Sequence, residues 1–127
     1  MTENAEEPWP SEINLKENGR LFRIRFENGD EYNLSAEYLR VMSPSAELQG
    51  HRASERKTLG GKRHCWITAI TPVGTYAVRL TFDDGHATGI YTWRYLHELG
   101  SRHADKWAVY EAELAAKGLT RDKPGEA

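Results

Sequence analysis

Two short turn signals constrain the fold of this chain more than any other feature. Asn28-Gly29 and Asp84-Gly85 consist of residues that accept positive φ, which the turn of a two-residue hairpin requires. The residues around the first turn alternate between apolar and polar, as in strands with one buried and one exposed face. Each signal therefore predicts an antiparallel hairpin, and Asn18-Gly19 predicts another near the start of the chain.

Both halves of the chain follow one plan of three strands and a helix. Ser35 and Thr92 are placed to cap the two helices, and Gly100 is expected to end the second. The similarity of Phe26-Glu27-Asn28-Gly29 to Phe82-Asp83-Asp84-Gly85 fits an internal duplication, and equally the common order of turn, strand and capped helix. The expected strands cover residues 13–15, 22–26, 31–34, 64–71, 75–82 and 86–91, with Tyr76, Val78, Leu80 and Phe82 on one face of the fifth.

A last helix is expected over residues 102–117. Trp107, Tyr110 and Leu114 form one stripe along it, which indicates that this helix is anchored in the core. Ser101 is placed to cap its start.

The predicted fold class is α+β. We expect a small, mostly antiparallel β-sheet domain built from two strand-strand-strand-helix units plus a C-terminal helix. A length of 127 residues suits one domain. Residues 1–11 and 119–127 are polar, charged and contain proline, so we expect disordered tails around a domain at 12–118.

Composition excludes several classes of protein. No apolar run approaches the roughly 20 residues of a membrane span, and the acidic N-terminus lacks the apolar segment of a signal peptide. The single cysteine, Cys65, excludes an internal disulfide and a multi-cysteine zinc site. We therefore expect a cytoplasmic protein without membrane association. A net charge of −2 gives no overall attraction to nucleic acid.

The sequence carries no recognisable catalytic motif. It has no G-x-S-x-G, phosphate-binding loop or dinucleotide fingerprint. Cys65 follows His64 directly, and neighbours on a strand point to opposite faces, so the two cannot act as nucleophile and base. We expect a buried cysteine and a protein that is not an enzyme.

Asp83, Asp84 and His86 form the densest group of possible metal ligands. Carboxylate and imidazole ligands together suit iron, manganese or zinc. Further ligands would have to come from Glu47, His51 or His64. The alternative is a simple hairpin turn, because aspartate side chains favour turns by bonding to the backbone.

The segment 51–64 is basic. Its cations could contact phosphate, RNA or an acidic partner, but no aromatic residues alternate with them, as binding of single-stranded nucleic acid would require. We expect a solvated loop and no nucleic-acid partner.

Three motifs resemble the gamma-butyrobetaine hydroxylase-like N-terminal domain family. They are Tyr38-Leu39-Arg40, Ser43-Pro44-Ser45-Ala46-Glu47 and Phe82-Asp83-Asp84-Gly85-His86, and the similarity extends over residues 12–118. The resemblance implies a small α+β domain that occurs as a stand-alone bacterial protein without a settled activity. It also implies relatives in which this domain precedes the catalytic domain of a dioxygenase, or is fused to P-loop ATPases of iron–sulfur cluster assembly.

The resemblance also implies a difference in metal binding. Zinc-bearing members carry three cysteines after a motif like Leu39-Arg40, and a histidine later in the domain. This chain has Ser43, Ser45 and Leu48 at the cysteine positions and keeps His86. Serine hydroxyls are poor zinc ligands, so we expect no cofactor. We expect Ser43, Ser45 and His86 to meet in space, because the metal joins these two segments in the relatives.

These observations lead to one functional hypothesis and one alternative. We expect a non-enzymatic adaptor that serves metalloprotein or iron–sulfur cluster assembly through protein contacts, with an iron–sulfur assembly ATPase as a possible partner. Tyr91 or Trp93 would be its apolar anchor. The alternative is a metal-binding domain that holds iron or zinc through His86 and Asp84. The expected binding surface consists of Ser43, Ser45, Glu47, His51, Asp84, His86, Tyr91 and Trp93.

Overall fold

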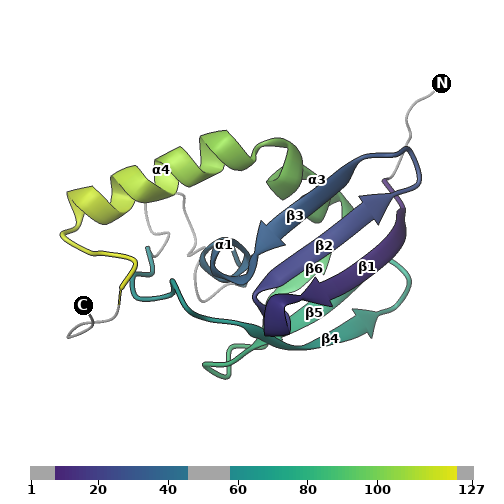
Figure 1. The fold of residues 1–127 in the computed structure, drawn as a ribbon, viewed down its shortest axis with the longest axis horizontal. Helices are drawn as coiled ribbons and strands as arrows, with labels where there is room; N and C mark the ends of the chain where they lie inside the picture. The colour runs from purple at the N-terminus through teal and green to yellow at the C-terminus, as the bar shows by residue number, and fades with distance from the viewer. Residues whose placement is uncertain (1–7, 46–57, 123–127) are drawn as a thin grey trace.

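The computed structural model describes residues 8–45 and 58–122, which form two three-stranded antiparallel sheets and several helices (Figure 1). This confirms the predicted α+β fold. The first unit contains β1 (Pro10–Lys16), the 3-10 turn η1 (Glu17–Gly19), β2 (Leu21–Phe26), β3 (Glu31–Ser35) and α1 (Ala36–Val41). The second contains β4 (Ile67–Val73), β5 (Ala77–Phe82), β6 (Ile90–Thr92) and α3 (Trp93–Ser101), and α4 (His103–Ala116) follows.

The predicted turns and caps are present in both units. Gly29 and Gly85 adopt positive φ, and their backbone N–H groups donate to Phe26 O and Phe82 O respectively. The caps on α1 and α3 match as well: Ser35 Oγ accepts from the N–H of Tyr38 at 3.0 Å, and Thr92 Oγ1 from that of Tyr95 at 3.1 Å. The structure thus repeats the strand-strand-strand-helix plan that the sequence predicts.

Two strands are shorter than expected. The strand predicted at 64–71 begins at Ile67, and the strand predicted at 86–91 covers only Ile90–Thr92. His86 and Thr88 instead turn their side chains toward the loop that follows α1, where they form hydrogen bonds. The side chains of this segment therefore bond to the loop after α1, while its backbone keeps one bond to β5, from the N–H of Phe82 to His86 O at 3.0 Å.

The core lies between the two sheets and the helices. In Figure 1 the sheet of β1, β2 and β3 overlies that of β4, β5 and β6. Alternation along β2 and β5 correctly predicts which residues of these strands form one buried face, except that Tyr76, expected on that face, is exposed in the turn before β5. The fully buried side chains include Phe22, Ile24, Phe26, Leu34, Leu39, Leu80, Phe82, Leu96, Leu99 and Tyr110. None of the helices in the described part combines the length and apolar character that a membrane crossing requires.

The join between α3 and α4 differs from the prediction. Gly100 and Ser101 lie inside α3, so Gly100 does not end that helix and Ser101 does not cap α4. A Cβ on Gly100 would lie 2.3 Å from Cγ of Tyr32, so glycine is required here by close packing against a side chain of β3. The stripe on α4 is confirmed, because Tyr110 and Leu114 are buried and Trp107 packs against the core.

Contacts extend past the expected domain limits of 12 and 118. Pro10 already pairs with Phe26 in the first sheet. At the other end, Thr120 and Arg121 accept backbone hydrogen bonds from Gly61 and Arg63. The remaining parts of the expected tails, 1–7 and 123–127, lie outside the described residues.

Candidate functional site

The loop after α1 and the segment after β5 meet in a group of side chains that we call the serine junction: Ser43, Ser45, His86 and Thr88. Ser43 Oγ lies 3.0 Å from His86 Nε2, and Ser45 Oγ lies 2.9 Å from Thr88 Oγ1. Gly89 permits this approach, because a Cβ there would lie 2.4 Å from Ser43 Oγ. The predicted meeting of Ser43 with His86 is confirmed, and Ser45 contacts the same segment through Thr88.

Asp84 adds an ionic link between the same two segments. Its Oδ2 accepts from Arg40 Nε at 2.9 Å and from Lys62 Nζ at 2.6 Å, while its Oδ1 accepts from the N–H of His86 at 3.0 Å. Burial raises the pKa of the Asp84 carboxyl, but the hydrogen bonds from Lys62, His86 and Arg40 outweigh it and hold the pKa well below its usual range. Asp84 is therefore ionised and fully engaged in holding the hairpin to α1.

The structure corrects the expected binding surface. Ser43 and Tyr91 are fully buried, and Ser45 is nearly so, so these three side chains cannot contact a partner. Tyr91 donates its hydroxyl proton to Leu39 O, and burial raises its pKa. Tyr91 is therefore not the apolar surface anchor that the functional hypothesis expects. Glu47 and His51 lie outside the described residues.

Trp93 belongs to a different part of the surface, which we call the tryptophan groove: Trp9, Tyr76, Trp93 and Arg94. These side chains and Thr92 line a hollow of about 410 Å³. Trp9 is 47% exposed and Tyr76 is 54% exposed. The sequence patterns mark neither residue as part of a site: Trp9 stands in an expected tail, and Tyr76 lies in the turn before β5 rather than on the face of that strand where it is expected.

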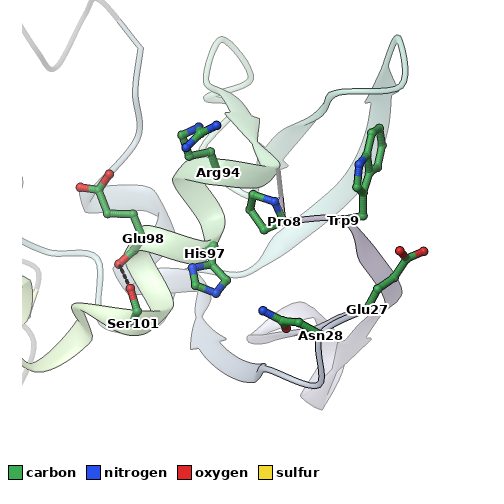
Figure 2. Close-up of a pocket in the computed structure, with 8 residues that line it drawn as sticks. All are labelled: Pro8, Trp9, Glu27, Asn28, Arg94, His97, Glu98 and Ser101. Atoms are coloured by element: carbon green, nitrogen blue, oxygen red, sulfur yellow. Dashed lines mark hydrogen bonds between the residues drawn. The ribbon is translucent and has the colours of Figure 1, made fainter. Parts of the chain in front are cut away.

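A second hollow of about 540 Å³ adjoins this groove and shares Trp9 and Arg94 with it. Figure 2 shows Pro8 between these two side chains, with His97 below them on α3. His97 Nε2 lies 2.8 Å from Asp30 Oδ2, and the His97 ring packs edge-on against Phe26 at 5.0 Å between centroids. This wall of the hollow is thus fixed by contacts between α3 and the β2–β3 hairpin.

Cys65 is buried, as predicted. Burial is the main cause that raises the pKa of its thiol to about 12. The thiolate is the nucleophilic form, so this cysteine is poorly suited to nucleophilic chemistry at neutral pH.

Comparison with known proteins decides the family. The family model described as gamma-butyrobetaine hydroxylase-like, N-terminal, matches residues 13–97. The chain belongs to this family. No match was found among the curated proteins.

Solved structures are similar to this member of the family over most of its length. Two NMR solution structures share 43% and 42% identity, with TM-scores of 0.80 and 0.79. They cover 96% and 100% of this chain, and 95% and 98% of their own chains. A crystal structure of a DUF971 family protein of unknown function from Acidithiobacillus ferrooxidans is 36% identical. It covers 74% of this chain and 97% of its own, with a TM-score of 0.61.

The zinc site that the family resemblance implies does not fit the residues present here. Ser43 offers a neutral hydroxyl that faces His86 and accepts from the N–H of Ser45 at 3.3 Å. Asp84 already binds two cationic side chains. Within residues 8–45 and 58–122, no group of three or more His, Cys, Asp or Glu side chains could hold a metal ion. The serine junction is organised as a hydrogen-bonded link.

Proposed function

We propose that this family member is a non-enzymatic adaptor that docks a protein of iron–sulfur cluster or other metalloprotein assembly through the tryptophan groove. The observation that carries the proposal is the exposure of Trp9 and Tyr76 beside Trp93, around one hollow. Tryptophan and tyrosine dominate the energetics of protein interfaces because they bury a large apolar area and keep a polar tip.

The backbone around these rings is already held in place. Trp93 Nε1 donates to Thr75 O at 2.9 Å, and Trp9 O accepts from the N–H of Glu27 at 2.8 Å. The ring of Tyr76 packs against Gly74, where a Cβ would lie 3.1 Å from it. A surface that is ordered before binding loses less conformational entropy when a partner docks, which favours affinity.

The partner class rests on the family, in which the domain is found fused to P-loop ATPases of iron–sulfur cluster assembly. This is an argument by domain association, and the groove supplies the physical surface for it.

A binding measurement between the purified chain and the iron–sulfur assembly ATPase of the same organism tests the proposal. We expect Trp9→Ala and Tyr76→Ala each to weaken binding at least tenfold, which corresponds to the loss of about 1.4 kcal/mol or more. The matched control is Val109→Ala, an exposed apolar side chain on α4 that does not line the groove. Absence of binding, or equal affinity of Trp9→Ala and the control, would contradict the proposal.

Metal binding through His86 and Asp84 is the alternative. Elemental analysis of untagged protein separates the two functions. One equivalent of iron or zinc that is lost in His86→Ala would replace the adaptor proposal, whereas the engagement of Asp84 by Arg40 and Lys62 leads us to expect no stoichiometric metal.

A further inference from the structure

A third groove is lined by side chains of α1, α4, the first sheet, the segment before β4 and the C-terminal segment. Figure 1 shows the C-terminal segment running back from the end of α4 toward the segment before β4. The open volume of the groove, with Arg121 as part of the wall, is about 410 Å³. The side chains that matter for its chemistry are Arg20, Glu37, Arg63, His103, Trp107 and Arg121. None of them lines the tryptophan groove.

Glu37 is the buried carboxylate of this groove and binds the side chain of Arg121. Its side chain is only 4% exposed, and an ionised carboxylate at such a position is costly unless a cation pairs with it. Arg121 supplies that cation in a two-pronged arrangement: Nε lies 2.7 Å from Oε2 and Nη2 lies 2.7 Å from Oε1. The guanidinium carbon also lies 5.2 Å from the centroid of the Trp107 ring, within range of a cation–π contact. The pocket is thus shaped for a planar guanidinium rather than an ammonium.

The guanidinium that pairs with Glu37 comes from a short segment at the wall of the groove, which we call the strap: residues 119–122. Thr120 O accepts from the N–H of Gly61 at 2.9 Å, and Arg121 O accepts from the N–H of Arg63 at 3.0 Å. Gly60 permits this contact, because a Cβ there would lie 2.6 Å from Thr120 O. These two backbone bonds hold the strap against residues 61–63 without forming a strand pair.

The site also contacts the residue that follows the arginine, Asp122. Arg63 Nε donates to Asp122 Oδ1 at 2.6 Å, so an acidic side chain follows the arginine in the bound segment. The strap lies beyond the end of α4 and beyond residues 13–97, which the family model matches, whereas Glu37 lies inside that range. Glu37 and Arg63 therefore lie in the part of the chain that the family model matches, whereas the strap that they bind lies outside this part.

We propose that Glu37, Trp107 and Arg63, on the wall of this groove, form a recognition site for a short peptide that carries arginine followed by an acidic residue, and that the strap is the intramolecular segment bound there. A partner segment of this chemistry binds by displacing the strap, so the strap lowers the apparent affinity for the partner. Charge complementarity determines which peptide binds. The buried carboxylate of Glu37 pairs with the guanidinium of the arginine, and Arg63 pairs with the acidic side chain that follows it. The site is separate from the tryptophan groove, so either proposal can fail without the other.

The test uses the full chain with Arg121→Ala and a blocked peptide of residues 118–122 as the probe. We expect the variant to bind this peptide in a 1:1 complex by calorimetry, and the unchanged chain to bind it at least tenfold more weakly. A peptide with lysine in place of arginine should bind the variant at least tenfold more weakly than the arginine peptide. Adding Glu37→Gln to Arg121→Ala should abolish binding.

Arg121→Lys is the second variant, because it keeps a cation beside Glu37 and so preserves the fold if Arg121→Ala unfolds. The arginine peptide should still bind Arg121→Lys more tightly than it binds the unchanged chain. No binding by either variant, equal affinity for the lysine peptide, or binding that survives Glu37→Gln would overturn the proposal. A concentration-dependent dimer of the unchanged chain that Arg121→Ala dissociates would overturn it too, because the occupant would then be the strap of a second copy.

Discussion

Ser43 Oγ and His86 Nε2 lie 3.0 Å apart and join two segments separated by 43 positions in the sequence. The contact between Ser45 and Thr88 and the ion pair between Arg40 and Asp84 connect the same two parts of the chain. Where zinc-bearing relatives are expected to join these segments through a metal, this chain uses hydroxyl, imidazole and carboxylate groups. The serine junction is therefore a structural link whose loss should be measurable as stability.

Replacing Ser43 by alanine should lower the free energy of unfolding by about 1–3 kcal/mol, because it removes a buried hydroxyl and the hydrogen bonds it forms. Urea denaturation followed by circular dichroism measures the change. Ser101→Ala is the matched control, since the Ser101 hydroxyl is exposed and bonds only locally to Glu98 O, so its effect should stay within about 0.5 kcal/mol. Equal effects of the two substitutions would show that the serine junction contributes nothing to stability.

The low pKa of Asp84 in the folded protein predicts how stability depends on pH. A carboxyl whose pKa is lower when folded than when unfolded stabilises the fold above its unfolded pKa of about 3.9, and this contribution is lost as pH falls below that value. Asp84→Asn should therefore lower stability at pH 7 and flatten the decline between about pH 5 and pH 2.

Urea midpoints at several pH values check this prediction for Asp84. Asp105→Asn is the control, because Asp105 lies on an exposed turn of α4 and its contact with Arg102 is 3.9 Å long. The informative quantity is the difference between each variant and the unchanged chain, since other carboxylates also contribute to acid sensitivity. A decline in Asp84→Asn as steep as that in the control would contradict the prediction.

Gly100→Ala should destabilise the protein, although alanine favours helices over glycine by up to about 1 kcal/mol. The new Cβ would lie 2.3 Å from Cγ of Tyr32, so the ring or α3 must move, and overpacking of this kind costs about 1–3 kcal/mol. Thermal and urea unfolding measure the effect. In a Tyr32→Ala background the same substitution should be neutral or stabilising. Destabilisation that persists without the Tyr32 ring would place its cause elsewhere.

The parts of the fold that the sequence predicts correctly are those decided by neighbours in the chain. A cap such as Ser35 depends on an N–H group three positions away, and the turn at Asn28-Gly29 depends on its own φ angles. The prediction that Gly100 ends α3 is wrong because the position is decided by Tyr32, which comes from β3, distant in the sequence. No local pattern distinguishes a glycine that ends a helix from one that makes room for a ring.

The candidate site also contains contacts that the sequence predicts and contacts that it does not. The meeting of Ser43 with His86 was predictable only because the family resemblance indicates that the two segments are joined in relatives. Burial of Tyr91 was not predictable, since it depends on α1 covering one face of β6 through the bond from its hydroxyl to Leu39 O. Trp9 was missed because acidic and proline residues around it suggest a tail, whereas the pairing of Pro10 with Phe26 holds this end against β2.

Cys65 should react slowly with thiol reagents in the folded protein. The side chain is buried, and burial is the main cause that raises its pKa to about 12, so very little thiolate is present at pH 8. We expect alkylation by iodoacetamide to be at least a hundredfold slower in buffer than in denaturing urea, where the thiol returns to a pKa of about 8.5. Mass spectrometry follows the reaction, and a short cysteine peptide in both solutions corrects for any effect of urea on the reagent. A folded-state rate close to that of the peptide would show that Cys65 is accessible and ionised, and would return thiol chemistry to the possible functions of this domain.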